Sequence, residues 1–181
     1  MDSSLSSEPT RVSRGELALL RHAVHGDGRT VGLATVLPAL QSRHRKELRN
    51  EPRWSKEELV RHPEPRELIR SMRKAGNLDE HGRPLYTLDE RRSLTANIYE
   101  NRLVRDVIED VRRRLRTLRD DPASGVGDEA DELLRDLEGA RRQAPFLDEV
   151  VSRQPTALPT ATLTQDPLYR TVLGIRVRLT G

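Results

Sequence analysis

The feature that most constrains the fold is an apolar seam between residues 104 and 118. Its members are spaced by four, three, four and three residues: Val104, Ile108, Val111, Leu115 and Leu118. That spacing places them on one side of an α-helix, and Leu103 and Val107 widen the seam into the stripe of a helix that packs on a globular core. We therefore predict a long helix that begins near Thr95 or Asn97 and ends near Arg119.

A second helix is predicted after a loop. Residues 120–127 read Asp-Asp-Pro-Ala-Ser-Gly-Val-Gly, and an amphipathic segment opens at Asp128 or Asp131. The first helix ends in a run of arginines, and the second begins with aspartates and glutamates. Because these two ends are neighbours in an antiparallel pair, we predict a charged helical hairpin over residues 91–152 whose basic and acidic ends face each other.

Composition limits both the core and the chemistry. With one Phe, one Trp and three Tyr in 181 residues, the core must be aliphatic. The absence of cysteine excludes disulfides, thiolate metal sites and a cysteine nucleophile, and it is typical of a reducing compartment. No apolar run approaches the roughly 20 residues that cross a bilayer, and residues 1–14 lack a signal-peptide pattern. We therefore expect a cytoplasmic protein with no membrane partner.

The N-terminal half predicts shorter elements. A capping-box pattern at Ser13 predicts a helix to about His25, and a similar pattern at Ser55 predicts one to about His62. Residues 66–75 predict a helix with Leu68, Ile69 and Met72 inside. The apolar stretch 31–40, interrupted by a proline, fits strand or helix equally, and residues 85–88 fit a short strand.

The predicted fold class is mainly α: a helical hairpin plus short N-terminal helices, with room for one small β element. Four parts follow from these patterns: a disordered tail over 1–12, a helical region with loops over 13–90, the charged hairpin over 91–152, and an extended connector leading to a C-terminal apolar helix over 153–181. An apolar segment that closes the chain fits a fragment, or a subunit that docks its tail on a partner.

No complete catalytic pattern occurs. Nucleotide-binding, zinc-protease, serine-hydrolase and calcium-loop spacings are absent, and none of the three lysines has an acidic residue two positions before it, as PD-(D/E)XK nucleases require. His22 and His25 have helical spacing, but only Asp27 stands near them as a further ligand, so two surface histidines without a metal is the expected interpretation. We therefore expect no enzyme activity, no cofactor and no metal.

Two short polar patterns stand at predicted helix starts. The first is Glu100-Asn101-Arg102, and the second is Asp166-Pro-Leu-Tyr169-Arg170. Helix capping explains both in ordinary structural terms, because Asn, Asp and an early Glu suit a helix N-terminus. The functional alternative is a polar network that joins the hairpin to the C-terminal segment and organises a binding surface.

The order of these patterns resembles a known family. An "ENR" segment opens a long amphipathic helix, a charged hairpin follows, and "DPLYR" leads into an apolar helix. This resembles the helical domain that precedes the PD-(D/E)XK nuclease in McrC-like restriction proteins, over roughly residues 60–181. The resemblance implies a non-catalytic scaffold or adaptor in a prokaryotic DNA-restriction or antiphage defence complex, beside an AAA+ motor, a nuclease subunit or both. The nuclease motif itself is absent.

Two alternatives remain open from the residues alone. Residues 11–50 hold eight basic and three acidic side chains, so this segment could bind DNA or RNA directly through Arg43, Arg45, Lys46 and Arg49. The lack of interleaved aromatics argues against a stacking platform there. The seam could instead mediate self-association into a structural homo-oligomer.

Overall fold

The chain folds into two units. The computed structural model describes residues 11–56, 59–60, 65–151 and 160–181. One unit comprises residues 1–45 and 96–181 and is called the helical unit here; the other comprises residues 46–95 and is called the hairpin unit. The mainly α fold class is confirmed. The boundary at 45/46 falls inside the segment predicted as a single N-terminal region, because the first helices belong to the same core as the charged hairpin.

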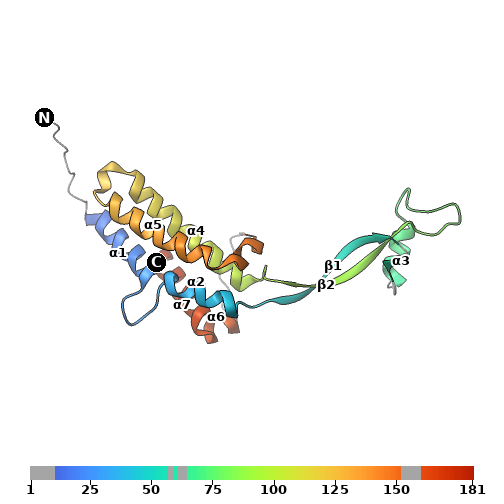
Figure 1. Ribbon diagram of the computed structural model, residues 1–181, viewed down its shortest axis with the longest axis horizontal. Helices are drawn as coiled ribbons and strands as arrows, with labels where there is room; N and C mark the ends of the chain where they lie inside the picture. The colour runs from blue at the N-terminus through green and yellow to red at the C-terminus, as the bar shows by residue number, and fades with distance from the viewer. Residues whose placement is uncertain (1–10, 57–58, 61–64, 152–159) are drawn as a thin grey trace. The chain divides into compact units, whose positions relative to one another are not determined.

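The helical unit is built from six α-helices among the described residues (Figure 1). They are α1 (Arg11–His25), α2 (Leu33–Arg43), α4 (Tyr99–Asp120), α5 (Gly127–Arg142), α6 (Ala161–Gln165) and α7 (Pro167–Thr180). Two short 3₁₀ turns, Pro122–Ser124 and Pro145–Glu149, follow α4 and α5. Within the described ranges, no helix combines the length and apolar character needed to cross a membrane.

The predicted hairpin of two long helices is confirmed as α4 and α5. Every member of the seam is buried, from Val104 at 0% to Leu118 at 8% exposed. Leu133 and Leu137 of α5 complete this core together with apolar side chains of α1, α2 and α7. The seam is therefore filled by the chain's own helices, which removes it as the surface for self-association.

The opposed charges of the hairpin also meet as predicted. Arg112 Nε lies 2.7 Å from Glu138 Oε1, and Arg119 lies 3.9 Å from Asp131. These groups are at least partly exposed, so each pair adds only about 0–1 kcal/mol of stability. Their effect is to favour this alignment of α4 along α5 over alignments in which the two helices are shifted.

The ambiguous stretch 31–40 forms most of α2. Pro38 lies within this helix, where it removes one main-chain hydrogen bond but leaves the apolar face intact. Gly32 precedes the helix, and a Cβ atom at that position would lie 2.3 Å from the carbonyl oxygen of Val24. The close approach of α1 and α2 therefore depends on glycine. The expected cap at Ser13 is not the helix start, because α1 begins at Arg11.

The C-terminal segment corrects one prediction and confirms another. Residues 161–165 form α6 rather than an extended connector, because Thr160 caps this turn by accepting a hydrogen bond from Leu163 N. The part of the connector at 153–159 and residues 1–10 of the predicted tail lie outside the described residues, whereas residues 11–12 of that tail are not disordered but belong to α1. The helix entry at Asp166 is confirmed, since its carboxylate accepts from Leu168 N at 2.9 Å.

The hairpin unit contains the small β element. Strand β1 (Glu47–Lys56) pairs antiparallel with β2 (Tyr86–Thr95), in a register that places Trp54 opposite Leu88. Ser55 therefore lies in a strand, and the helix predicted to start there is wrong at that residue, while residues 57–58 and 61–64 fall outside the described part. The strand predicted at 85–88 is confirmed in β2 and is longer than expected.

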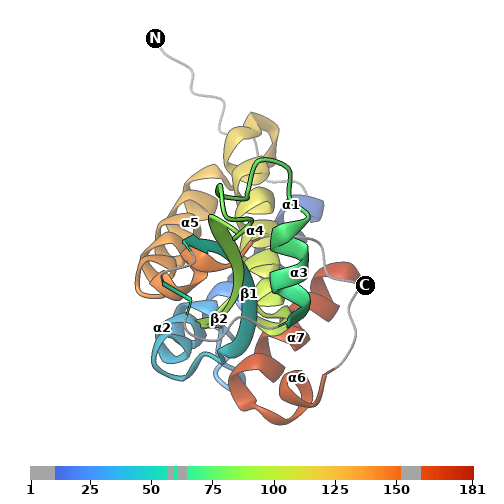
Figure 2. The ribbon, with the colours of Figure 1, turned by 90° about the vertical axis from the view of Figure 1, so that its right-hand side faces the viewer.

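Helix α3 (Pro65–Met72) packs beside this hairpin (Figure 2). Polar contacts link the two elements. Ser71 Oγ accepts from Leu88 N at 2.9 Å, and Asn77 Nδ2 donates to Ser71 O at 2.9 Å. Both polar side chains are buried. The prediction that Ile69 and Met72 lie inside is wrong, since they are 52% and 46% exposed.

Candidate functional site

A buried hydrogen-bond network centres on Asn101 and Tyr169, which are both fully buried. The Tyr169 hydroxyl donates to Asn101 Oδ1 at 2.6 Å and accepts from Arg45 N at 3.1 Å. The Asn101 amide nitrogen donates to the carbonyl oxygens of Arg45 at 2.9 Å and Ala96 at 2.7 Å. The two sequence patterns, 68 residues apart at these positions, therefore meet in the core.

This network holds both ends of the insertion that forms the hairpin unit. Arg45 is the last residue of the helical unit before the insertion, and Ala96 is the first residue after it. One amide group therefore fixes the points where the chain leaves and re-enters the helical unit. Burial raises the pKa of Tyr169 to about 12, so its hydroxyl stays protonated and able to donate at neutral pH.

The other members of the predicted network are distributed around this pair. Glu100 accepts a hydrogen bond from Thr160 Oγ1 at 2.7 Å, which ties the start of α4 to the start of α6. Arg102 donates from Nε to Asn97 Oδ1 at 2.8 Å, a local contact. Arg170 is exposed. The structure thus brings Asn101 and Tyr169 together and leaves Arg102 and Arg170 outside that contact.

The basic residues predicted to bind nucleic acid divide between the units. Arg43 is exposed at the end of α2, and the Arg45 guanidinium donates to Thr162 Oγ1. Lys46 and Arg49 belong to the hairpin unit, where Arg49 Nε lies 3.7 Å from Glu47 Oε2. Two of these four cations are therefore already engaged by neighbouring side chains.

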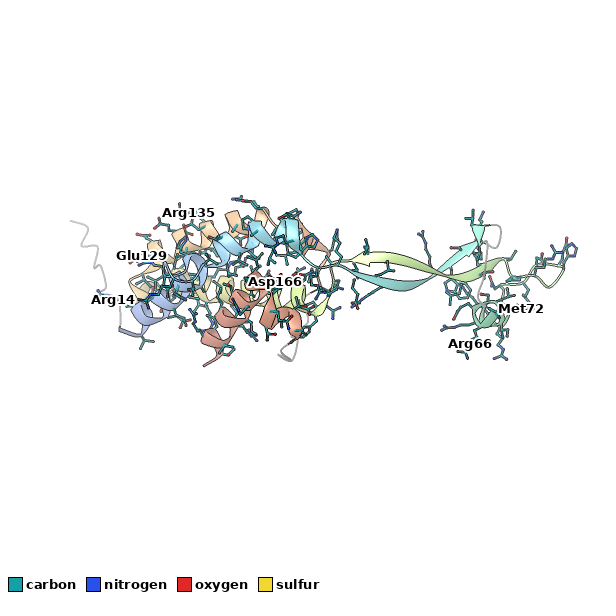
Figure 3. The ribbon with its side chains drawn as sticks, turned by 90° about the horizontal axis from the view of Figure 1, so that it is seen from below. Arg14, Arg66, Met72, Glu129, Arg135 and Asp166 are labelled. Carbon is teal, nitrogen blue, oxygen red and sulfur yellow. The ribbon has the colours of Figure 1, made fainter. Side chains whose placement is uncertain are left out.

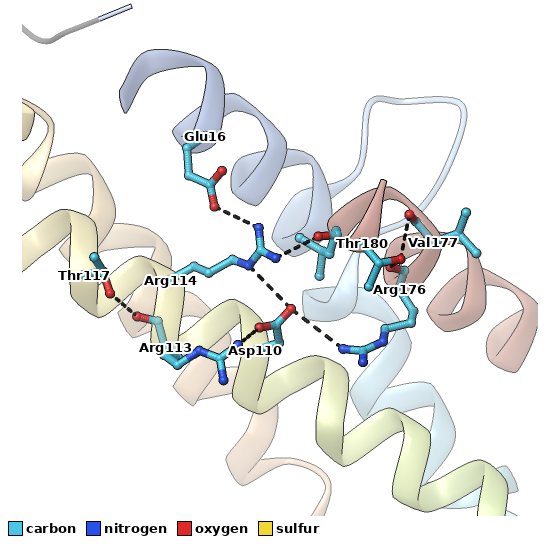
Figure 4. Close-up of polar contacts among 9 residues, drawn as sticks. Glu16, Asp110, Arg113, Arg114, Thr117, Arg176, Val177 and Thr180 are labelled. Atoms are coloured by element: carbon cyan, nitrogen blue, oxygen red, sulfur yellow. Dashed lines mark hydrogen bonds and ion pairs between the residues drawn. The ribbon is translucent and has the colours of Figure 1, made fainter. Parts of the chain in front are cut away.

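An ion-pair cluster around Asp110 was not predicted (Figure 4). Asp110 is only 6% exposed, and its carboxylate contacts Arg113, Arg114 and Arg176. Arg114 also reaches Glu16 at 3.1 Å, and its NH2 group donates to the carbonyl oxygen of Leu179 at 2.7 Å. The cluster therefore joins α1, α4 and α7. Its only sequence signal is the spacing of arginines three and four residues after an acid.

The chemistry of this cluster is structural. A general base or metal ligand needs a carboxylate with a free lone pair facing a substrate, whereas three guanidinium groups surround Asp110. The two histidines of α1 are in separate, at least partly exposed pairs, His22 with Asp27 at 3.7 Å and His25 with Asp136 at 3.2 Å. Across the described ranges, no three His, Asp or Glu side chains gather as metal ligands.

Exposed apolar side chains gather in the hairpin unit. Thirteen large hydrophobic residues are exposed among those described, and nine belong to residues 46–95: Leu48, Trp54, Leu59, Ile69, Met72, Leu78, Leu85, Tyr86 and Leu94. Leu48 and Leu94 face each other across the two strands. Exposed apolar side chains that lie next to one another, as Leu48 and Leu94 do, are typical of an interaction surface.

Comparison of the chain with protein-family models, with curated proteins and with solved structures found no match.

Proposed function

We propose that this protein is a non-catalytic adaptor that binds a protein partner through its hairpin unit. The observation that carries the proposal is the concentration of exposed large apolar side chains on residues 46–95. The helical unit has the opposite character: its aliphatic side chains form one core, and only four large hydrophobics are exposed among its described residues.

Burial of the exposed side chains supplies the driving force for association. Removing apolar surface from water is worth roughly 25 cal/mol per Å², and aromatic residues and methionine are enriched at the centres of protein interfaces. Trp54, Met72 and Tyr86 are 38%, 46% and 44% exposed. The hairpin unit therefore presents residue types that protein partners bind most tightly.

The resemblance to McrC-like proteins suggests the first partners to test. It implies an AAA+ motor, a nuclease subunit, or both, in a prokaryotic DNA-restriction or antiphage defence complex. The contact between Asn101 and Tyr169 supports treating the two motifs as one structural unit, because each motif contributes one member of the buried pair.

The test is affinity purification of the tagged full chain from its native host at near-physiological salt, with quantitative mass spectrometry. One variant carries Leu48→Ser, Ile69→Ser and Leu94→Ser in the hairpin unit, where the original side chains are 56%, 52% and 65% exposed. The matched control carries Val12→Ser, Val151→Ser and Val177→Ser in the helical unit, at 81%, 53% and 61%.

We expect the wild type and the control to recover the same partner, and the hairpin variant to lose it. Circular dichroism of the two variants establishes that both retain their helices. Equal loss in both variants would contradict a docking surface on the hairpin unit. Recovery of this protein alone, together with a concentration-dependent dimer in sedimentation, would replace the adaptor by a homo-oligomer.

A further inference from the structure

Helix α3 and the turn after it carry four exposed cations. Arg66, Arg70, Arg73 and Lys74 are separated by four, three and one residues. Arg73 N still donates to Ile69 O at 3.2 Å, so a helical period of 3.6 residues extends just past α3 and places the three arginines on one side. Lys74 follows in the turn, and the whole segment is about 12 Å long. Ile69 and Met72 fall on the adjoining side, and Figure 3 labels Arg66 and Met72 on this helix. The solvent-facing surface of α3 therefore has a basic half and an apolar half.

Among the described residues, few carboxylates lie near the cations of the basic half. Glu67 is 4.0 Å from Arg70, at the limit of an ion pair, and among the described residues no carboxylate pairs with Arg66 or Arg73. The Lys74 ammonium lies 3.9 Å from the centroid of the Trp54 ring, which leaves its charge uncancelled. In the helical unit, by contrast, Arg112 and Arg114 are each paired with glutamate.

We propose that this basic half of α3 binds the phosphate backbone of a nucleic acid. Arginine presents a planar fork that matches phosphate oxygens in bidentate fashion, and three of the four cations are arginines. A DNA duplex carries one negative charge per roughly 1.7 Å of axis, so several phosphates lie within the 12 Å or so that these cations span. The proposal adds a second ligand to the adaptor and does not require the protein partner.

The segregation of the two halves allows both ligands at once. Phosphate contacts would use the guanidinium groups of Arg66, Arg70 and Arg73, whereas Ile69 and Met72 remain available to a protein. Phosphate contacts alone carry no sequence information, so binding through this surface is independent of base sequence.

The experiment titrates the full chain with a short fluorescein-labelled DNA duplex and follows anisotropy. Trp54 is the only tryptophan and touches Lys74, so its fluorescence reports binding at this surface. Three or four phosphate contacts predict an affinity loss of about 40- to 150-fold between about 50 and 200 mM salt.

Two quadruple variants with the same change in net charge locate the site. Arg66→Gln, Arg70→Gln, Arg73→Gln and Lys74→Gln together should weaken low-salt binding more than about tenfold and flatten the salt dependence. The matched control replaces four exposed arginines of the helical unit by glutamine: Arg14, Arg29, Arg142 and Arg178. It should change affinity less than about threefold.

A third variant keeps the charge, so that a folding defect is separable from a binding defect. Arg66→Lys, Arg70→Lys and Arg73→Lys should bind within about tenfold of wild type with an unchanged salt slope. The proposal is overturned by absence of binding at low salt, by equal weakening in both glutamine variants, or by polyglutamate competing as well as DNA. The apolar serine variant of the hairpin unit should still bind DNA, which distinguishes this site from the protein-docking surface.

Discussion

Replacing Asn101 by alanine should destabilise the helical unit more than any exposed substitution. The amide donates to two carbonyl groups, of Arg45 and Ala96, and accepts from the Tyr169 hydroxyl. Asn101→Ala removes all three hydrogen bonds and adds no replacement partner. Because Asn101 is completely buried, water cannot reach the groups left behind without opening the core.

The expected loss follows from the number of groups left without a partner. Each buried polar group that loses its partner costs about 1–3 kcal/mol. The Tyr169 hydroxyl can rotate, and a carbonyl oxygen suffers less than a buried N–H group, so we expect a total of about 2–5 kcal/mol. That is a large fraction of the roughly 5–15 kcal/mol by which a domain is stable.

Urea unfolding gives the measurement, with a separate probe for each unit. Far-UV circular dichroism follows the helical unit, and Trp54 fluorescence follows the hairpin unit. With a slope of about 2 kcal/mol per M urea, the dichroism midpoint should fall by about 1–2.5 M. The exposed neighbour of Tyr169 provides the control, because Arg170→Ala should change stability by less than about 0.5 kcal/mol.

A double-mutant cycle tests whether the two side chains act as a pair. Tyr169→Phe removes the hydroxyl alone, and combined with Asn101→Ala it should cost less than the sum of the single changes by at least about 1 kcal/mol. Additive losses, or a loss below about 1 kcal/mol for Asn101→Ala, would refute the reasoning that this network is dry and cooperative.

Three further predictions concern the same unit. Burial raises the pKa of Tyr169 to about 12 in the folded protein, against 10.0 in the unfolded chain. The protonated hydroxyl therefore stabilises the fold fully below pH 10, and this contribution is lost as the pH rises to about 12. The free energy of unfolding should fall by about 2–3 kcal/mol over this pH range, measured by denaturant titrations at stepped pH. In Tyr169→Phe the free energy of unfolding should depend less on pH. Asp110→Ala removes a buried carboxylate from Arg114 and Arg176, whose side chains are 30% and 27% exposed, and Arg114 keeps its contact with Glu16. The change should cost about 1–3 kcal/mol in urea unfolding, whereas Arg113→Ala, at a 72% exposed side chain, should cost less than about 1 kcal/mol. Gly32→Ala would place Cβ 2.3 Å from Val24 O and should lower the melting temperature, while Gly15→Ala in α1, with no atom within 4 Å, should raise stability by about 0.5–1 kcal/mol.

The helical hairpin was predictable because its signal is local. The seam residues recur with helical period within 15 residues, and their burial needs only a partner helix next in sequence. The β-hairpin lacked such a signal. Strand β1 contains Pro52, and its large apolar residues Leu48 and Trp54 are both exposed, so its described side chains form no buried face that would impose an alternating pattern.

The buried network was predictable only where its side chains form a local pattern in the sequence. Asn101 and Tyr169 were found because both stand at helix starts with polar neighbours. The involvement of Arg45 was not predictable, since it contributes its main-chain N–H and carbonyl, which leave no trace in the side-chain sequence. The Asp110 cluster was missed because a carboxylate among arginines looks like an ordinary solvated helix face.

The anchoring of the insertion leads to one further prediction about the division between the units. The carbonyl oxygens of Arg45 and Ala96 both accept from one nitrogen of Asn101, so they lie within about 6 Å of each other. A linker of about two to four turn-forming residues can close that gap in place of residues 46–95. The resulting chain should keep the helical unit's dichroism and unfold within about 1 kcal/mol of the parent, because no described side chain of residues 46–95 belongs to the core on α4. It should also lose both protein-partner and DNA binding. Unfolding of this deletion variant would show that the helical unit depends on the insertion, and retained binding would move both proposed surfaces onto the helices.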